Sequence, residues 1–235
     1  MNLSTLRKEL EPYKDSKKAD QSKRFFKTGI GEYGENEVFL GITAPVLRRL
    51  SKAYMTISVD DNLELLKSKY HEERLLALFI LVLKFQKSKT ETERIQIYES
   101  YIKNFKYVNN WDFVDSSAHH IVGAYLIDKD RQILRQWANS DDLWTKRIAM
   151  MSTFYFIKQN EFNTSLDIAK ILLFDKHDLI HKAVGWMLRE IGNRSINTEE
   201  EFLKKYYKKM PRTMLRYATE KFPEEKRQAY LKGAI

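Results

Sequence analysis

The chain has 235 residues, of which 43% are hydrophobic and 13% aromatic, and this is enough to build a sizeable folded core. Forty-one Lys and Arg against 32 Asp and Glu give a net charge of +9, mixed along the chain, which excludes a disordered charged tail and favours a polyanionic partner. The lack of cysteine excludes disulfides, thiolate nucleophiles and cysteine-based zinc sites.

The predicted elements, taken in chain order, are almost all helices. Only four prolines and eight glycines interrupt the chain, and apolar residues recur between them at three-and-four spacing. The predicted helices cover residues 4–15, 17–27, 44–55, 61–70, 72–87, 91–105, 111–127, 142–159, 164–174, 179–192, 198–210 and 212–222. The pattern therefore predicts an all-α chain of short antiparallel helix pairs.

Similar helical segments recur along the chain. "ERLLALFI" begins at Glu73, "KRIAMMST" at Lys146 and "HKAVGWML" at His181, and the helix that starts at Trp111 lies midway between the first two. The spacing of about 35 to 37 residues is typical of helical repeats, which stack into a solenoid with a concave surface. With no linker composition in between, we expect a single domain over 1–235, an α-α superhelix with a concave, basic groove.

Neither the start of the chain nor its longest apolar run indicates a membrane protein. The first residues, "MNLSTLRKEL", contain no apolar signal-peptide core. The longest apolar run, "LLALFILVL" at 75–83, is about half the length that a bilayer span requires and predicts a buried helix. We therefore expect a soluble, cytoplasmic protein with no membrane partner.

Two short motifs have the wrong context for the sites that they superficially match. "GIGEYG" at 29–34 has the glycine spacing of dinucleotide sites, but a basic helical segment precedes it instead of a buried strand, so it predicts a turn or mobile loop. His177 and His181 lie one helical turn apart, yet Asp178 stands where a zinc protease has its general-base Glu, and the segment is typical of a helix start. We expect neither a metal nor a cofactor.

The segment "VNNWDFVDSS" at 108–117 places a carboxylate beside an indole. If Asn110 caps the helix, its apolar arc consists of Val114, Ala118, Ile121, Val122 and Tyr125. Trp111 then lies at the edge of the arc and Asp115 just outside it, half desolvated. A carboxylate near a helix N-terminus also complements the helix dipole without any function, although that account suits Asp112 better. These residues alone are compatible with a functional role for Asp115 and with a structural one.

A second tryptophan lies between two cations in "LIHKAVGWMLRE". The core stripe of this helix is Ile180, Val184, Met187 and Ile191. Trp186 is left on another side, with Lys182 four residues before it and Arg189 three after it. Phosphates and a sugar or base would cover such a surface, and packing of Trp186 against a neighbouring helix pair explains it equally well.

Four segments together, "FLGITAP", "NNWDFVD", "LWTKRIAM" and "KAVGWMLRE", resemble the AlkD-like DNA alkylation repair family over nearly the whole chain. This family consists of proteins with a HEAT-like helical-repeat solenoid and includes DNA glycosylases, so the resemblance implies a HEAT-like superhelix for this chain. The resemblance places the family's catalytic carboxylate on Asp115, its two groove tryptophans on Trp111 and Trp186, and its DNA-facing arginine on Arg147. Two departures concern the N-terminal part: the groove tyrosine of the alkylpurine glycosylases falls on Phe25 or Phe26, and the loop "TGIGEYGENEVF" is longer.

The resemblance implies a hydrolase of N-glycosyl bonds that excises cationic N3- or N7-alkylated purines from duplex DNA in base excision repair, as a monomer and without a cofactor. Such a base leaves as a neutral molecule, so one carboxylate suffices to stabilise the oxocarbenium-like transition state and to position water. The implied catalytic residues are Asp115, Trp111 and Trp186, and the implied DNA-binding residues are Arg147, Lys182, Arg189, Phe25 and Phe26.

Three other functions stay open. The main alternative is a non-catalytic helical-repeat protein that binds damaged or branched DNA. An RNA-binding helical repeat would require side chains at fixed repeat positions that each read one base, and the sequence contains no such regular pattern. A protein-binding scaffold would leave the pairing of Asp115 with Trp111 unexplained.

Overall fold

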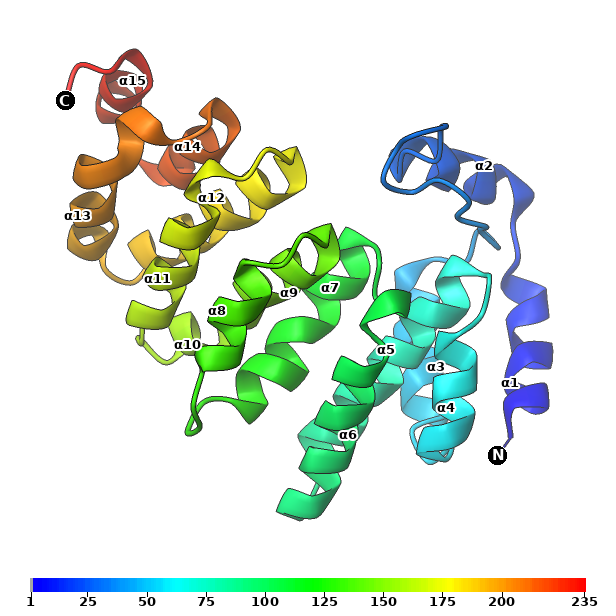
Figure 1. Ribbon diagram of the computed structural model, residues 1–235. Helices are drawn as coiled ribbons and strands as arrows, with labels where there is room; N and C mark the ends of the chain where they lie inside the picture. Colours follow the sequence, from blue (N-terminus) through cyan, green and yellow to red (C-terminus); the bar gives the residue numbers. More distant parts are fainter. Residues whose placement is uncertain (1) are drawn as a thin grey trace. The chain divides into compact units, whose positions relative to one another are not determined.

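The computed structural model describes residues 2–235, and within this range the regular structure is helical. No β-strand forms there, and the single extended contact is an isolated parallel bridge between Val38 and Tyr70. The all-α prediction is confirmed. The chain forms two compact units, Met1–Ile121 and Val122–Ile235 (Figure 1). The expectation of one domain over 1–235 stays a prediction, as does the basic groove.

The helices of the first unit are α1 (Leu3–Leu10), α2 (Ser16–Phe25), α3 (Ala44–Ala53), α4 (Val59–Leu66), α5 (His71–Lys87), α6 (Glu91–Lys103) and α7 (Trp111–Ala118). The helices of the second unit are α8 (Gln132–Ala138), α9 (Leu143–Ser152), α10 (Phe154–Lys158), α11 (Asn163–Ile171), α12 (Asp178–Gly192), α13 (Ile196–Tyr206), α14 (Arg212–Ala218) and α15 (Glu224–Lys232). Short 3₁₀ turns end several of them.

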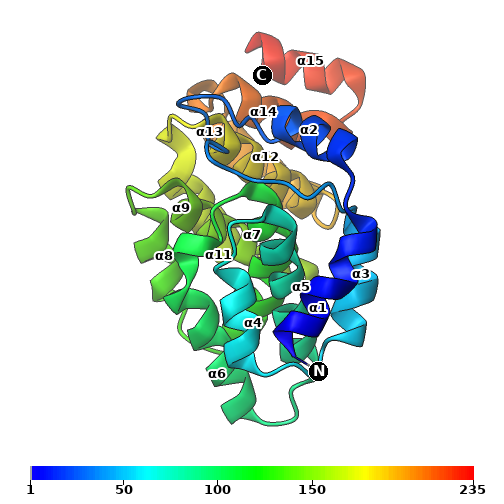
Figure 2. The ribbon, with the colours of Figure 1, turned by 90° about the vertical axis from the view of Figure 1, so that its right-hand side faces the viewer.

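Helix α5 is the centre of the first unit. It contains the apolar run 75–83, and α3, α4, α6 and α7 all pack against it (Figure 2). A helix that is apolar on all sides needs neighbours on all sides, which explains this arrangement. The prediction of a buried helix is confirmed, and the surrounding helices fix the start of α5 against the start of α7.

Stacked helix pairs make up much of the second unit. Helix α12 packs against α9 on one side and α14 on the other, while α8 lies on α9, and α11 and α13 both lie on α12. The predicted stripe of α12 is fully buried. At Gly185 an added Cβ would lie 2.4 Å from the carbonyl oxygen of Met214, so only glycine permits the observed approach of α12 and α14.

Several element boundaries differ from those predicted. Helices α8 and α15 were not predicted, because each buries few side chains and their apolar periodicity is weak. The predicted helix 142–159 is two helices that meet at Thr153, whose hydroxyl donates to the carbonyl of Met150. The predicted helix 111–127 passes from α7 into a π-helical turn at His119–Gly123.

Among residues 2–235, no helix combines the length and the apolarity that crossing a bilayer would require.

Candidate functional site

Helix α7 holds Trp111 and Asp115 at the half-exposed edge of the first unit's core. Asn110 caps the helix as predicted, and its side-chain oxygen accepts a hydrogen bond of 2.8 Å from the backbone N–H of Trp111. Val114 and Ala118 are fully buried, which orients the helix. Trp111 and Asp115, one turn apart, are therefore both only partly buried.

The phenol of Tyr101, on the core side of α7, interacts electrostatically with Asp115 and stays protonated. Tyr101, from α6, is fully buried, and its hydroxyl is 2.8 Å from the hydroxyl of Ser117. Burial, and to a smaller degree the negative charge of Asp115, raises the pKa of Tyr101 far above its usual value. The group behind the carboxylate is thus neutral at every physiological pH.

An aromatic surface covers the start of α7. Phe26 stacks on Trp111 with ring centroids 5.3 Å apart and an interplanar angle of 21°, and Phe25 meets Trp111 edge-on at 5.6 Å. Phe26 also stacks on Phe39, at 5.2 Å. Phe25 is 65% exposed. The fold thus brings together three of the residues singled out in the sequence, and they present apolar ring surface at the end of α2.

A buried cluster of four charged residues, His71, Glu37, Arg74 and Asp112, lies beneath this aromatic surface and is called the ionic cluster below. The His71 ring places Nδ1 2.9 Å from Glu37 Oε2 and Nε2 2.8 Å from Asp112 Oδ2. Arg74 Nη2 donates to both oxygens of Glu37 at 2.5 Å, and its Nη1 donates to Asn109 at 2.6 Å. The cluster therefore links the loop at 28–38, the start of α5 and the start of α7.

The charges of the ionic cluster stabilise one another. Burial lowers the pKa of His71, but the carboxylates of Asp112 and Glu37 outweigh it and raise that pKa to about 9. Burial acts to raise the pKa of Glu37, but His71 and Arg74 hold it below its usual value. Sequence reasoning missed Glu37, His71 and Arg74, and it considered Asp112 only as a complement to the helix dipole. The available signal was the run of charged residues at the start of the most apolar helix, because charges are rarely buried unless they are paired.

The segment "FLGITAP" at 39–45 is fixed by Glu72, the second residue of α5. Glu72 Oε2 accepts from the N–H of Leu40 at 2.8 Å, and Oε1 accepts from the N–H of Gly41 at 2.7 Å. Gly41 has φ of 79°, and an added Cβ would lie 1.9 Å from the carbonyl oxygen of Asp15. This glycine is therefore required where α2 begins beside the loop.

In the second unit, α12 carries Trp186 with the two cations that the sequence indicated. Trp186 is half-buried, lies 5.9 Å from the ring of Phe154, and donates from Nε1 to Glu190 at 3.3 Å. Lys182 forms an ion pair of 2.8 Å with Asp178, and Arg189 pairs with Glu220. Both cations thus have carboxylate partners within the unit, with which a phosphate would compete.

Arg147, on α9, is more deeply placed than its predicted DNA contact suggested. It is only 4% exposed, and its Nη1 donates to the carbonyl oxygen of Leu179 at the start of α12. The guanidinium therefore has a structural role that sequence reasoning did not foresee, since it links α9 to the first turn of α12.

Two other features separate from α7 have structural explanations. His177 caps α12 through a hydrogen bond from the N–H of Leu179, as the prediction of a helix start implied, and His181 Nε2 lies 2.6 Å from the carbonyl oxygen of Asp175. Within residues 2–235 no group of three His, Cys, Asp or Glu side chains has the arrangement of a metal site. "GIGEYG" forms turns, as predicted.

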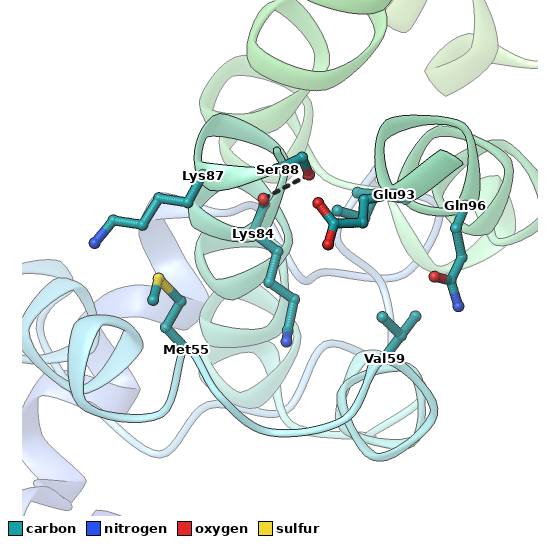
Figure 3. Close-up of a pocket in the computed structure, with 8 residues that line it drawn as sticks. Met55, Val59, Lys84, Lys87, Ser88, Glu93 and Gln96 are labelled. Carbon is teal, nitrogen blue, oxygen red and sulfur yellow. Dashed lines mark hydrogen bonds between the residues drawn. The ribbon is translucent and has the colours of Figure 1, made fainter. Parts of the chain in front are cut away.

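A cavity of about 310 Å³ lies between the end of α5, the start of α6 and the segment before α4 (Figure 3). Figure 3 shows the amine of Lys84 extending between Met55 and Val59, and burial lowers the pKa of this amine. The carboxylate of the cavity, Glu93, accepts from the N–H of Thr90 in a capping box. None of the residues that the sequence singled out lines this cavity, and its one acid has a structural role.

Comparison with known proteins identifies the family of the chain and supports its fold. The family described as DNA alkylation repair enzyme matches residues 6–222. A solved structure described as a predicted DNA alkylation repair enzyme from Enterococcus faecalis is similar to this chain with a TM-score of 0.68 and 16% identity, covering 90% of this chain and 97% of that one. At this identity the likeness establishes the fold. No curated protein matches this sequence.

The family match spans almost the whole chain, including α5, α7, α9 and α12 with the residues described above. The chain therefore belongs to the DNA alkylation repair enzyme family.

Proposed function

We propose that this protein is a DNA glycosylase that removes cationic N3- or N7-alkylated purines from duplex DNA. The observation that carries the proposal is Asp115, a half-buried carboxylate one helical turn from the aromatic surface of Trp111, in a chain of the DNA alkylation repair enzyme family. Family membership supports a role in alkylation repair, and the residues on α7 suit one particular reaction within it.

The charge of the lesion decides how much catalytic machinery is needed. Alkylation at N3 or N7 makes the purine cationic, so the base departs neutral and needs no proton. Two tasks remain for the protein: to stabilise the positive charge that develops on the deoxyribose, and to position the attacking water. A preorganised carboxylate can do both, for about 3–4 kcal/mol of transition-state stabilisation, or two to three powers of ten in rate. Asp115 is proposed for this role.

The aromatic surface is proposed to pack against the damaged nucleotide and to exclude bulk water. Trp111 stacks on Phe26, so its ring is supported from behind by a second ring. Lower local polarity strengthens the interaction of Asp115 with a developing cation. The resemblance places the family's groove tyrosine on Phe25 or Phe26, so this surface is proposed to contribute apolar contact without a hydroxyl.

The cations of the second unit are proposed to bind phosphates of duplex DNA. Lys182 and Arg189 flank Trp186 on α12, and both would exchange a protein carboxylate for a phosphate. Such contacts supply affinity that depends on salt and not on base sequence. Trp186 and Arg147 keep their assignments as predictions, the latter with the added structural role at Leu179.

The test is release of free base from a duplex oligonucleotide that contains one 7-methylguanine. We expect the purified protein to release the base, and Asp115→Asn to lose release while it retains duplex affinity, since the neutral amide no longer repels phosphate. Asp141→Asn, at an exposed carboxylate, is the matched control and should retain release. Duplex binding without release by the wild type would favour the non-catalytic alternative.

The same assay tests substrate charge. We expect no efficient release of uracil or ethenoadenine, because these bases leave as anions unless they are protonated. His119, which is 6% exposed, lies one turn from Asp115 and is the histidine on which an alternative acid mechanism would depend. We therefore expect His119→Ala to retain most release of 7-methylguanine. Release of a neutral base that depends on His119 would replace the proposed mechanism with an acid and base pair.

A further inference from the structure

The ionic cluster has a geometry that only a charged histidine satisfies. Both ring nitrogens of His71 lie within 2.9 Å of carboxylate oxygens, one of Glu37 and one of Asp112. A neutral imidazole carries one N–H, so one of these contacts would set a lone pair against a carboxylate. An imidazolium donates from both nitrogens. His71 is 2% exposed, so water cannot substitute for either partner.

The charge count of the cluster points to the same state. The groups facing the His71 ring are Glu37 from the loop, Asp112 from α7 and, one turn further along α5, Arg74. With His71 protonated, two cations balance two anions. With His71 neutral, the buried cluster would hold one uncompensated negative charge, which is strongly unfavourable in an apolar environment.

The ring of His71 also touches the aromatic residues that support Trp111. Its centroid lies 4.6 Å from that of Phe26, 4.7 Å from Phe39 and 4.4 Å from Phe113. Asp112, which His71 holds, is the residue after Trp111, and Phe26, on which His71 packs, is the ring stacked on Trp111. Trp111 is thus connected to His71 through both its backbone neighbour and its ring neighbour.

We infer that His71, as an imidazolium between Glu37 and Asp112, is the positioning residue for Trp111: it ties the loop at 28–38 to the first turn of α7 and so keeps the Trp111 ring in one orientation. Glu37 gives the long loop its anchor in this assembly. The inference rests on the proposed function only in assigning Trp111 to the damaged nucleotide. The positioning itself is a property of the folded chain.

The direction of the pH dependence follows from the charge. A histidine whose pKa is raised by folding stabilises the fold fully below its ordinary value of 6.5, and this contribution is lost as pH rises through about 9. The Trp111 ring should therefore keep its single orientation over the whole neutral pH range and become mobile under alkaline conditions. Replacing Asp112 by Asn removes one of the two anions that raise the pKa of His71, so the pH at which the Trp111 ring becomes mobile should be lower.

The experiment reads Trp111 directly. The full chain has four tryptophans, and replacing Trp137, Trp144 and Trp186 by Phe leaves Trp111 as the only tryptophan, whose emission is followed separately from that of the tyrosines. Acrylamide quenching of the fluorescence then measures how accessible the Trp111 ring is to solvent. We expect weak, constant quenching from pH 6 to 8 and a several-fold rise with a midpoint near 9. His71→Gln should be strongly quenched already at pH 7, and Asp112→Asn should shift the midpoint downward.

Thr90→Ala, which removes the capping box of α6 away from the cluster, is the matched control for lost stability and should leave the quenching curve unchanged. If His71→Gln does not fold, the pH titration of the parent protein and the Asp112→Asn shift still decide the matter. A flat curve to pH 10, or an unshifted midpoint in Asp112→Asn, would overturn the inference.

Base release separates this inference from the proposed function, and it is measured on the wild type and on His71→Gln made in the chain with all four tryptophans, because Trp186 is itself a proposed catalytic residue. If Trp111 becomes accessible to acrylamide at alkaline pH as expected but the wild type excises no alkylated purine, the glycosylase proposal fails and the positioning role stands. If the wild type excises 7-methylguanine, His71→Gln excises it equally fast, and His71→Gln leaves the quenching of Trp111 unchanged, the positioning role fails and the glycosylase proposal stands.

Discussion

Replacing Glu199 by Gln should stabilise the protein at neutral pH and not under acidic conditions. Glu199, on α13, is 2% exposed, and its Oε1 has no hydrogen-bond partner. Its carboxyl lies against the end of α12, where a Cβ added to Gly192 would be 1.7 Å from Oε2. Burial, reinforced by Glu200 and opposed by Arg189, raises the pKa of Glu199 to about 8. The partial negative charge at a helix C-terminus acts in the same direction.

The sign and size of the effect follow from this pKa. The unfolded carboxyl ionises near 4.5, while the folded one keeps its proton to about 8, so stability is lost as pH rises between these values. At about 1.4 kcal/mol per pH unit, the loss approaches about 4 kcal/mol by pH 7.5. A neutral glutamine avoids this loss, although its buried amide costs about 1 kcal/mol. The net gain at pH 7.5 is therefore about 3 kcal/mol, with a small loss at pH 4.5.

Denaturant unfolding of the wild type and Glu199→Gln at pH 4.5 and 7.5 provides the measurement. In a chain of this length the gain corresponds to a rise in melting temperature of roughly 6–12 °C. Glu201→Gln, at an exposed position of the same helix, is the control and should change stability equally little at both pH values. A Glu199→Gln effect of the same sign and size at both pH values would refute the assignment of a buried, protonated carboxyl.

Three further outcomes test other parts of the fold and site. Gly185→Ala should destabilise the protein by about 1–3 kcal/mol in a denaturant titration, despite the better helix propensity of alanine, because the added methyl group meets the carbonyl of Met214. Thr90→Ala should lower the free energy of unfolding by about 1 kcal/mol through loss of the cap of α6, and no change would mean that the capping box is not formed in solution. Arg147→Ala should reduce the salt dependence of duplex binding by about one unit of slope, whereas an unchanged slope with lower stability would assign the guanidinium to the carbonyl of Leu179 alone.

Local spacing was sufficient for much of the fold. Apolar residues three and four apart predicted nearly all helices, and the buried stripe of α12 from Ile180 to Ile191 is as predicted. The capping role of Asn110 and the exposure of Trp111 and Asp115 on one edge of α7 were also predictable, because residues one turn apart on a helix share a face wherever the helix packs. Helices α8 and α15 were missed because they bury too little for the periodicity to show.

The sequence by itself thus determined the fold class, the main helices and the placement of Asp115 one turn from Trp111 on the same helix, all of which depend on neighbours within a few residues. Only the tertiary structure decided which distant groups meet. Glu37, His71 and Asp112 lie more than 30 residues apart, and their contacts exist only once the loop, α5 and α7 have packed together. The same holds for the Phe26 and Trp111 stack and for the protonated Glu199, because a side chain's partner and its desolvation are set by packing and not by local spacing.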